Sequence, residues 1–247
     1  MSTGMEMVGP APAGRPPESE APRLVAVCGI GGGTGTSTLA FLSAMYAQRF
    51  LSAPLLLCDT GGPAASLAVL AEKQSQLSLP LAAAAIGADS LAVPLFVPLT
   101  AKVRLIAREP DFDDALDFDG LRRLLRDAGA AHPLTIVDCG TLQRPVERAV
   151  AEQASSILWT VQGSSLGAAR ARATLRSLPL AADQEILAVG PREKRSSAVE
   201  RELMNAADLR GAAVAFLPDI PEISEVGTNT ALEVCQVALE AIRGRLM

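Results

Sequence analysis

Short apolar runs alternate with longer, more polar segments along most of this chain. The apolar runs are rich in Val, Ile and Leu and predict buried strands at 24–27, 54–58, 102–108, 134–137, 156–161, 186–189 and 212–216. Helices are predicted over 36–50, 121–129, 144–155, 164–178, 194–208 and from about residue 230 onward. Strands that alternate with helices predict an α/β fold, in which a doubly wound, mostly parallel sheet carries helices on both faces.

Composition limits the classes of function. Residues 1–22 are rich in Pro, Gly, Ala and Glu and predict a disordered tail, so that 23–247 form a single domain. The net charge of −5 argues against broad nucleic-acid binding. The four cysteines form no CxxC pair and are expected to be buried, with a redox or metal site as the alternative. His132 is the only histidine, which leaves little for a His-based metal site or a catalytic triad.

The segment 24–40, LVAVCGIGGGTGTSTLA, predicts a strand, a glycine-rich loop and a helix. Such a loop presents backbone N–H groups to an anion, and the helix N-terminus favours phosphate. A P-loop reads G-x-x-x-x-G-K-[ST]. Counting back from Ser37, Gly35 is its last glycine, but Thr36 occupies the lysine position. The pattern fits either a phosphate cradle without its main charge or a tight turn between a strand and a helix.

Two predicted strands end in aspartate. Asp59 follows the run PLLLC, and Asp138 follows LTIV. Ligands of doubly wound sheets bind at the carboxyl ends of the strands, so both carboxylates are expected beside the glycine loop. There, the Ser37 hydroxyl and Asp138 would suit Mg²⁺. Taken singly, an aspartate at the end of a strand is more often a helix cap or a turn residue, but the glycine loop and the two aspartates together favour a nucleotide site.

These motifs resemble the MinD/ParA family of deviant P-loop ATPases. The family loop K-G-G-x-G-K-[ST]-[ST] corresponds to GGGTGTST over Gly31–Thr38. Asp59 resembles the first aspartate of the family's second motif, and Asp138 its Walker B aspartate. The segment LPDIPEISEVGTNT is similar to the late loop near the base, and the VRLIAR strand looks most like the CpaE/TadZ branch, which acts in pilus and secretion-system positioning. The resemblance implies ATP or ADP with Mg²⁺, metal contacts from Ser37 and Asp138, catalytic roles for Asp59 and Asp138 if the protein is active, and nucleotide contacts from Gly31, Gly32, Gly33, Thr34, Gly35, Thr36, Ser37, Thr38, Pro218 and Asp219.

The sequence departs from the family at the charged positions. The two family lysines fall at Gly31 and Thr36, the second D-x-D aspartate at Gly61, and the base-reading asparagine at Gly190. Loss of a cation that stabilises a reacting phosphate costs roughly 3–4 kcal/mol in catalysis. We therefore expect a non-catalytic or very weakly active relative, with nucleotide binding weak or lost, that works as a partner-binding or positioning factor.

Two alternatives stay open. One is an active ATPase in which an arginine, for example Arg104 or Arg108, replaces the lysines; the other is an interaction scaffold that binds no nucleotide. The resemblance implies a cytoplasmic protein that forms a homodimer, or a heterodimer with a related ATPase, through the glycine-loop face. The last helix is expected to dock on its own domain, with peripheral membrane contact as the alternative. Arg170, Arg172 and Arg176 crowd one helix, either as a solvated face or as a contact to a partner, DNA or acidic lipid.

Overall fold

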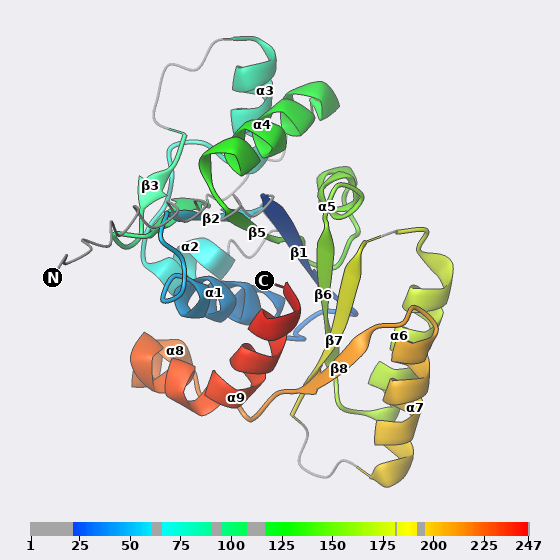
Figure 1. Cartoon of the computed structure of the whole chain (residues 1–247). Helices are drawn as coiled ribbons and strands as arrows, with labels where there is room; N and C mark the ends of the chain where they lie inside the picture. Colours follow the sequence, from blue (N-terminus) through cyan, green and yellow to red (C-terminus); the bar gives the residue numbers. More distant parts are fainter. Residues whose placement is uncertain are drawn as a thin grey trace, which may run out of the picture.

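The structure is a computed structural model of the 247-residue chain, and it describes residues 22–60, 66–89, 95–107, 117–180, 182–191 and 196–246. Within these ranges, eight strands form one sheet in the order β3-β4-β2-β5-β1-β6-β7-β8 (Figure 1). Every neighbouring pair is parallel except β3 with β4. The predicted doubly wound, mostly parallel sheet is confirmed.

The strands lie close to the predicted apolar runs. They are β1 (Arg23–Gly29), β2 (Leu55–Asp59), β3 (Val97–Pro98), β4 (Val103–Ile106), β5 (Leu134–Asp138), β6 (Ser156–Gln162), β7 (Gln184–Gly190) and β8 (Ala213–Phe216). The helices are α1 (Thr36–Ala47), α2 (Ser66–Ala71), α3 (Leu79–Gly87), α4 (Phe118–Ala131), α5 (Pro145–Ala151), α6 (Ser165–Ser177), α7 (Ser197–Asp208), α8 (Ile223–Val226) and α9 (Thr228–Leu246).

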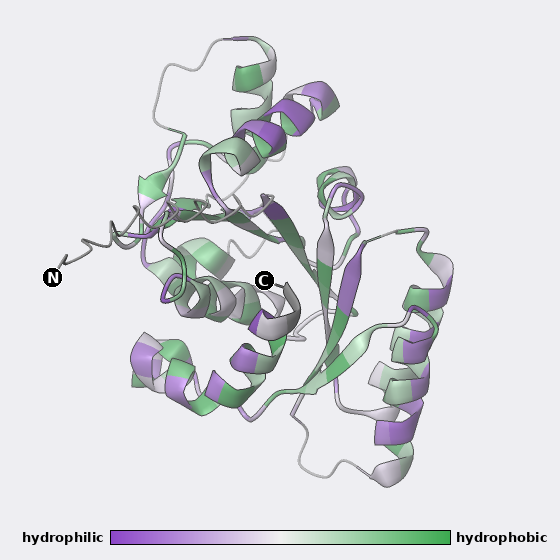
Figure 2. Ribbon diagram, in the orientation of Figure 1, coloured by the Kyte–Doolittle hydropathy of each residue, from purple (hydrophilic) through white to green (hydrophobic). Residues whose placement is uncertain are grey.

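Helices cover both faces of the sheet because successive residues of each strand point to opposite sides. In β1, Val25 and Val27 pack into one core with α1, α2, α8 and α9, while Ala26 and Cys28 pack into the other with α3 to α7. Figure 2 shows apolar residues along the central strands and hydrophilic residues on α4, α6 and α7. Burial on both faces explains why the strands read as continuous apolar runs in the sequence.

The C-terminal helix docks on its own domain, as expected. Leu232, Cys235 and Leu239 of α9 are buried in the core that also holds α1. Val237 lies on the outer side and is 85% exposed. All four cysteines are buried and free, which agrees with the prediction of core residues. Within the described ranges, no helix combines the length and the apolar character needed to cross a membrane.

Candidate functional site

The glycine loop joins the buried end of β1 to α1. Gly31, Gly33 and Gly35 have φ values of 104°, 68° and 80°, which only glycine adopts without strain. Gly35 is the N-cap of α1 and provides no side-chain cap. The first N–H groups of a helix have no partner within the helix, so this loop leaves them for a ligand.

Two backbone hydrogen bonds fix the start of the loop to its neighbouring strands. The N–H of Gly29 donates to the carbonyl of Gly140 at 2.6 Å, and the N–H of Ile30 donates to the carbonyl of Thr160 at 2.8 Å. The loop is therefore held between the carboxyl ends of β5 and β6, which is where ligands of such sheets bind.

Ser37 and Asp138 meet at the N-terminus of α1. The Ser37 hydroxyl donates a hydrogen bond to one carboxylate oxygen of Asp138, and the N–H of Gly140 donates to the other at 3.0 Å. Asp138 is the last residue of β5 and only 3% exposed. This direct contact confirms the prediction that the strand-ending aspartate lies beside the loop.

Asp59 lies next to Asp138 in the sheet. The two residues are register partners in β2 and β5, and the Oδ2 atom of Asp59 accepts a hydrogen bond from the N–H of Leu67 at 3.4 Å. Burial, and then repulsion from Asp59, raise the pKa of Asp138 to about 7, against the lowering effect of its bonds to Ser37 and Gly140. Two adjacent buried carboxylates favour a cation between or beside them.

These groups suit Mg²⁺. Magnesium binds oxygen ligands and usually takes only one or two side chains, with water and phosphate completing its shell. The Ser37 hydroxyl and the Asp138 carboxylate meet that need together. In the described part of the chain, no cluster of three or more His, Cys, Asp or Glu side chains offers a stronger metal site. Gly61, where the second family aspartate would stand, lies outside the described residues.

The side chain at the lysine position of the P-loop turns inward. The Thr36 hydroxyl is 2.9 Å from the Thr160 hydroxyl and 3.3 Å from the Thr34 hydroxyl, and Thr34 is 2.8 Å from Thr160. Thr36 is only 9% exposed. The three hydroxyls can hydrogen-bond to one another beneath the loop, and Thr36 offers no charge to a phosphate.

Two clefts flank the loop and meet at Gly33, Gly35 and Thr38. The cleft on the Asp138 side is also lined by Gly31, Thr36, Ser37, Val69, Leu70, Gly140 and Thr141. The cleft on the other side is also lined by Gln162, Gly190, Pro191, Leu217, Asp219 and Ile220. Thr34 lines both clefts, while Gly32 lies exposed at the tip of the loop.

The late loop is placed near this second cleft, with one distinction. Asp219 lines the cleft, but Pro218 lines a separate groove between β8 and α9. Gly190, where the family asparagine would stand, lines the cleft as the last residue of β7. The structure thus brings together the predicted residues of the glycine loop, Asp59, Asp138 and Asp219.

Arg104 does not replace a lysine at this loop. Its guanidinium lies 3.2 Å from the Nε2 atom of His132 and 4.5 Å from the ring centre of Phe96. His132 precedes β5, so this contact is at the amino end of the sheet, opposite the glycine loop. The suggestion for Arg104 is therefore wrong, and Arg108 lies outside the described residues.

Sequence reasoning missed Thr160 and Arg144. Thr160 lies near the carboxyl end of β6, and its hydroxyl contacts the hydroxyls of both loop threonines. Arg144 donates to the carbonyl of Thr60 at 2.8 Å and pairs with Glu147 at 2.8 Å. Thr60 in turn donates to the Asp138 carbonyl. Thr160 could have been found, because it is a polar residue near the carboxyl end of a predicted strand. The sequence around Arg144 contains no comparable signal.

Solved structures of low sequence identity share this fold. No protein-family model and no curated protein matches the chain. A ParA family ATPase from Chlorobium tepidum is 16% identical with a TM-score of 0.67, over 88% of this chain and 92% of that one. A chain of the MinC:MinD cell division complex of Aquifex aeolicus is 14% identical with a TM-score of 0.66, over 91% and 97%.

A third likeness includes a bound nucleotide. The septum site-determining protein MinD of Pyrococcus horikoshii, complexed with Mg-ADP, is 17% identical with a TM-score of 0.62, over 89% of this chain and 91% of that one. The chain has the MinD/ParA type of P-loop fold. At these identities, the likeness establishes the fold and leaves activity to be argued from the residues.

Proposed function

We propose that this chain is a MinD/ParA-like P-loop protein with a degenerate nucleotide site, which binds ATP or ADP with Mg²⁺ weakly and hydrolyses ATP little or not at all. One observation carries the proposal: Ser37 and Asp138 remain paired at the glycine loop, while Thr36 turns into a cluster of hydroxyls. The two groups that we propose as Mg²⁺ ligands are thus in place, whereas the neutral residues Gly31 and Thr36 occupy the two lysine positions.

The chemistry of phosphoryl transfer explains the expected loss of turnover. Catalysis rests on positioning and on charge offered to the oxygens of the transferring phosphoryl group. The loop offers N–H groups and one hydroxyl, but Gly31 and Thr36 supply no cation from the loop itself. Such a site can hold phosphate more readily than it can stabilise the charge that develops during transfer.

The proposed role of such a protein is to bind or position partners. Val69 of α2 is 70% exposed, and with Leu70 it lines the cleft on the Asp138 side. Apolar side chains beside a nucleotide site suit a contact with a second copy or with a related ATPase. The MinD chain of Aquifex aeolicus is found with MinC. A cytoplasmic location, peripheral membrane contact and the CpaE/TadZ branch are finer parts of this proposal.

Titration calorimetry with ATP and ADP, each with and without Mg²⁺, tests the binding half of the proposal. We expect weak, Mg²⁺-dependent binding that Asp138→Ala abolishes, while Asp219→Ala reduces it less because Asp219 lies in the cleft away from the metal ligands. Absence of binding at millimolar nucleotide would favour the scaffold alternative. A phosphate-release assay on the same protein would reveal the active-ATPase alternative.

A further inference from the structure

One arginine reaches the glycine loop from a helix more than a hundred residues away. Arg170 lies on α6, which follows the strand that holds the loop threonines. A Cβ atom placed on Gly31 would lie 3.1 Å from Nη1 of Arg170 and 3.8 Å from its Cδ. The guanidinium therefore lies directly against the backbone of Gly31, at the position where the family loop carries its signature lysine.

Gly31 makes this approach possible. It has no side chain, and its φ of 104° strains any other residue. The space that a lysine stem would take is filled instead by a cation from another element. The same φ angle means that a lysine introduced at Gly31 would meet both backbone strain and the Arg170 guanidinium.

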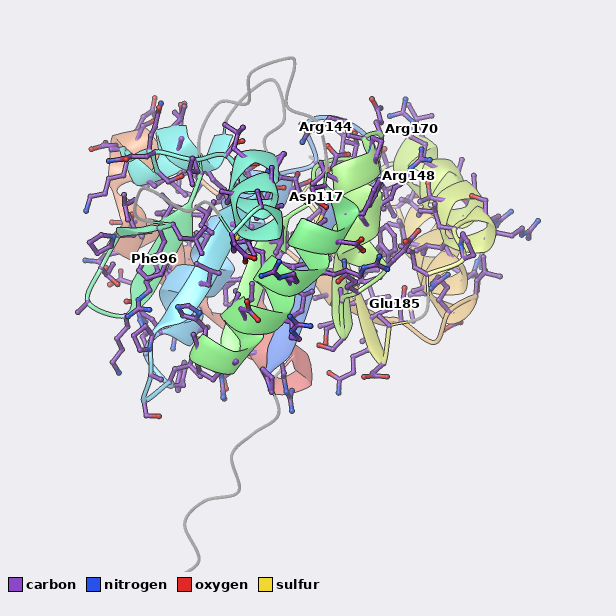
Figure 3. All side chains as sticks on the ribbon, turned by 90° about the horizontal axis from the view of Figure 1, so that it is seen from above. Phe96, Asp117, Arg144, Arg148, Arg170 and Glu185 are labelled. Atoms are coloured by element: carbon purple, nitrogen blue, oxygen red, sulfur yellow. The ribbon has the colours of Figure 1, made fainter. Side chains whose placement is uncertain are left out.

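Arg170 differs from the other arginines at this edge of the molecule, which Figure 3 labels together. Arg144 pairs with Glu147, and Arg148 donates to the carbonyl of Leu142 at 2.8 Å. Arg170 is exposed and, among the described residues, forms no hydrogen bond or ion pair. Its charge is therefore free for an external anion.

The position of Gly31 indicates which phosphate the arginine would meet. Gly31 lines the cleft on the Asp138 side and does not line the cleft of Gly190 and Asp219. A nucleotide with its base in the second cleft and its metal at Ser37 and Asp138 would extend its terminal phosphate toward Gly31. A guanidinium there can donate two parallel hydrogen bonds to phosphate oxygens.

We propose that Arg170 is a phosphate-binding residue that supplies, from α6, the cation missing from the glycine loop. By contacting the terminal phosphate of ATP, it favours a nucleoside triphosphate over a diphosphate. This inference rests on the proposed function, because it places the nucleotide in the same site. Arg170 replaces charge only at Gly31, and the position of Thr36 stays neutral. Binding is thus supported while hydrolysis remains weak.

The test compares Arg170→Ala with Arg172→Ala in titrations with Mg-ATP, Mg-ADP and Mg-pyrophosphate. Arg172 is the matched control, because it is an exposed arginine of the same helix and lies two residues further, on a different face. We expect Arg170→Ala to weaken Mg-ATP binding about tenfold and Mg-ADP binding about twofold. Arg172→Ala should match the wild type, and Arg170→Lys should recover part of the loss because it keeps the charge.

The outcomes separate the two proposals. If nucleotide binds and Arg170→Ala matches Arg172→Ala, the role of Arg170 is wrong and the proposed function stands. If nucleotide fails to bind but Mg-pyrophosphate binds in an Arg170-dependent way, the role of Arg170 stands and the proposed function is wrong. If no probe binds the wild type, both are wrong. Equal losses for ATP and ADP, without rescue by lysine, would indicate a structural effect and overturn the inference.

Discussion

Asp138 and Glu185 both have buried carboxylate groups, and they differ in whether the fold supplies a cationic partner. The Glu185 side chain is 5% exposed, pairs with Arg210 at 2.6 Å and accepts a hydrogen bond from Trp159 at 2.7 Å. The Asp138 carboxylate accepts hydrogen bonds from the Ser37 hydroxyl and the N–H of Gly140, and it lies beside Asp59. Among the described residues, no cation pairs with Asp138. A buried charge that the fold neutralises serves structure, whereas one left uncompensated marks a place for a ligand cation.

The position of Arg210 shows what the neutralised pair does. Arg210 follows α7, and its guanidinium also donates to the carbonyls of Leu178 and Leu180 in the connection from α6 to β7. One side chain thus joins the end of a helix, a strand and a loop. The charges of Glu185 and Arg210 are paired within the fold, in contrast to the charge of Asp138.

The largest expected effect is on stability, at the Glu185 pair. Glu185→Ala or Arg210→Ala should each lower the free energy of unfolding by about 3–5 kcal/mol, because each leaves a buried charge without its partner. Urea denaturation measures this change. The double variant should cost less than the sum of the single variants. Arg122→Ala is the control, since its ion pair with Asp119 is exposed and should be worth less than about 1 kcal/mol. Losses as small as the control would contradict the assignment.

Removing the charge of Asp138 should instead raise the free energy of unfolding, by an amount that depends on pH. Its pKa is raised from 3.8 to about 7 in the folded state, so its charged form destabilises the fold, and stability should fall as the pH rises from about 4 to about 7 and level off above that. Asp138→Asn should therefore stabilise the Mg²⁺-free protein at pH 8, by up to about 4 kcal/mol, with little gain at pH 4. Thermal melts of both proteins at the two pH values measure the difference. A variant that is less stable at pH 8 would show that the Asp138 charge is compensated.

The sequence predicted the scaffold of the site well. Strand ends and the glycine loop carry local signals, namely apolar runs that stop at aspartate and glycines before a helix, so Asp59, Asp138 and Ser37 were placed together. The contacts of Thr160 and Arg170 could not be predicted, because they join residues more than a hundred positions apart and depend on how β6 and α6 pack. The suggestion for Arg104 failed because a strand pattern does not show at which end of the sheet a side chain lies.

The central claim is that this loop keeps its metal ligands but has lost the charge needed for turnover. A steady-state phosphate-release assay on the wild type and Thr36→Lys tests it most directly, with melting curves to verify that the lysine variant folds. Thr36 is the position to change, since Gly31 is constrained by its φ angle and by Arg170. We predict no significant release from the wild type and measurable release from Thr36→Lys that is lost on adding Asp138→Ala. Robust wild-type turnover that Asp138→Ala abolishes would contradict the account.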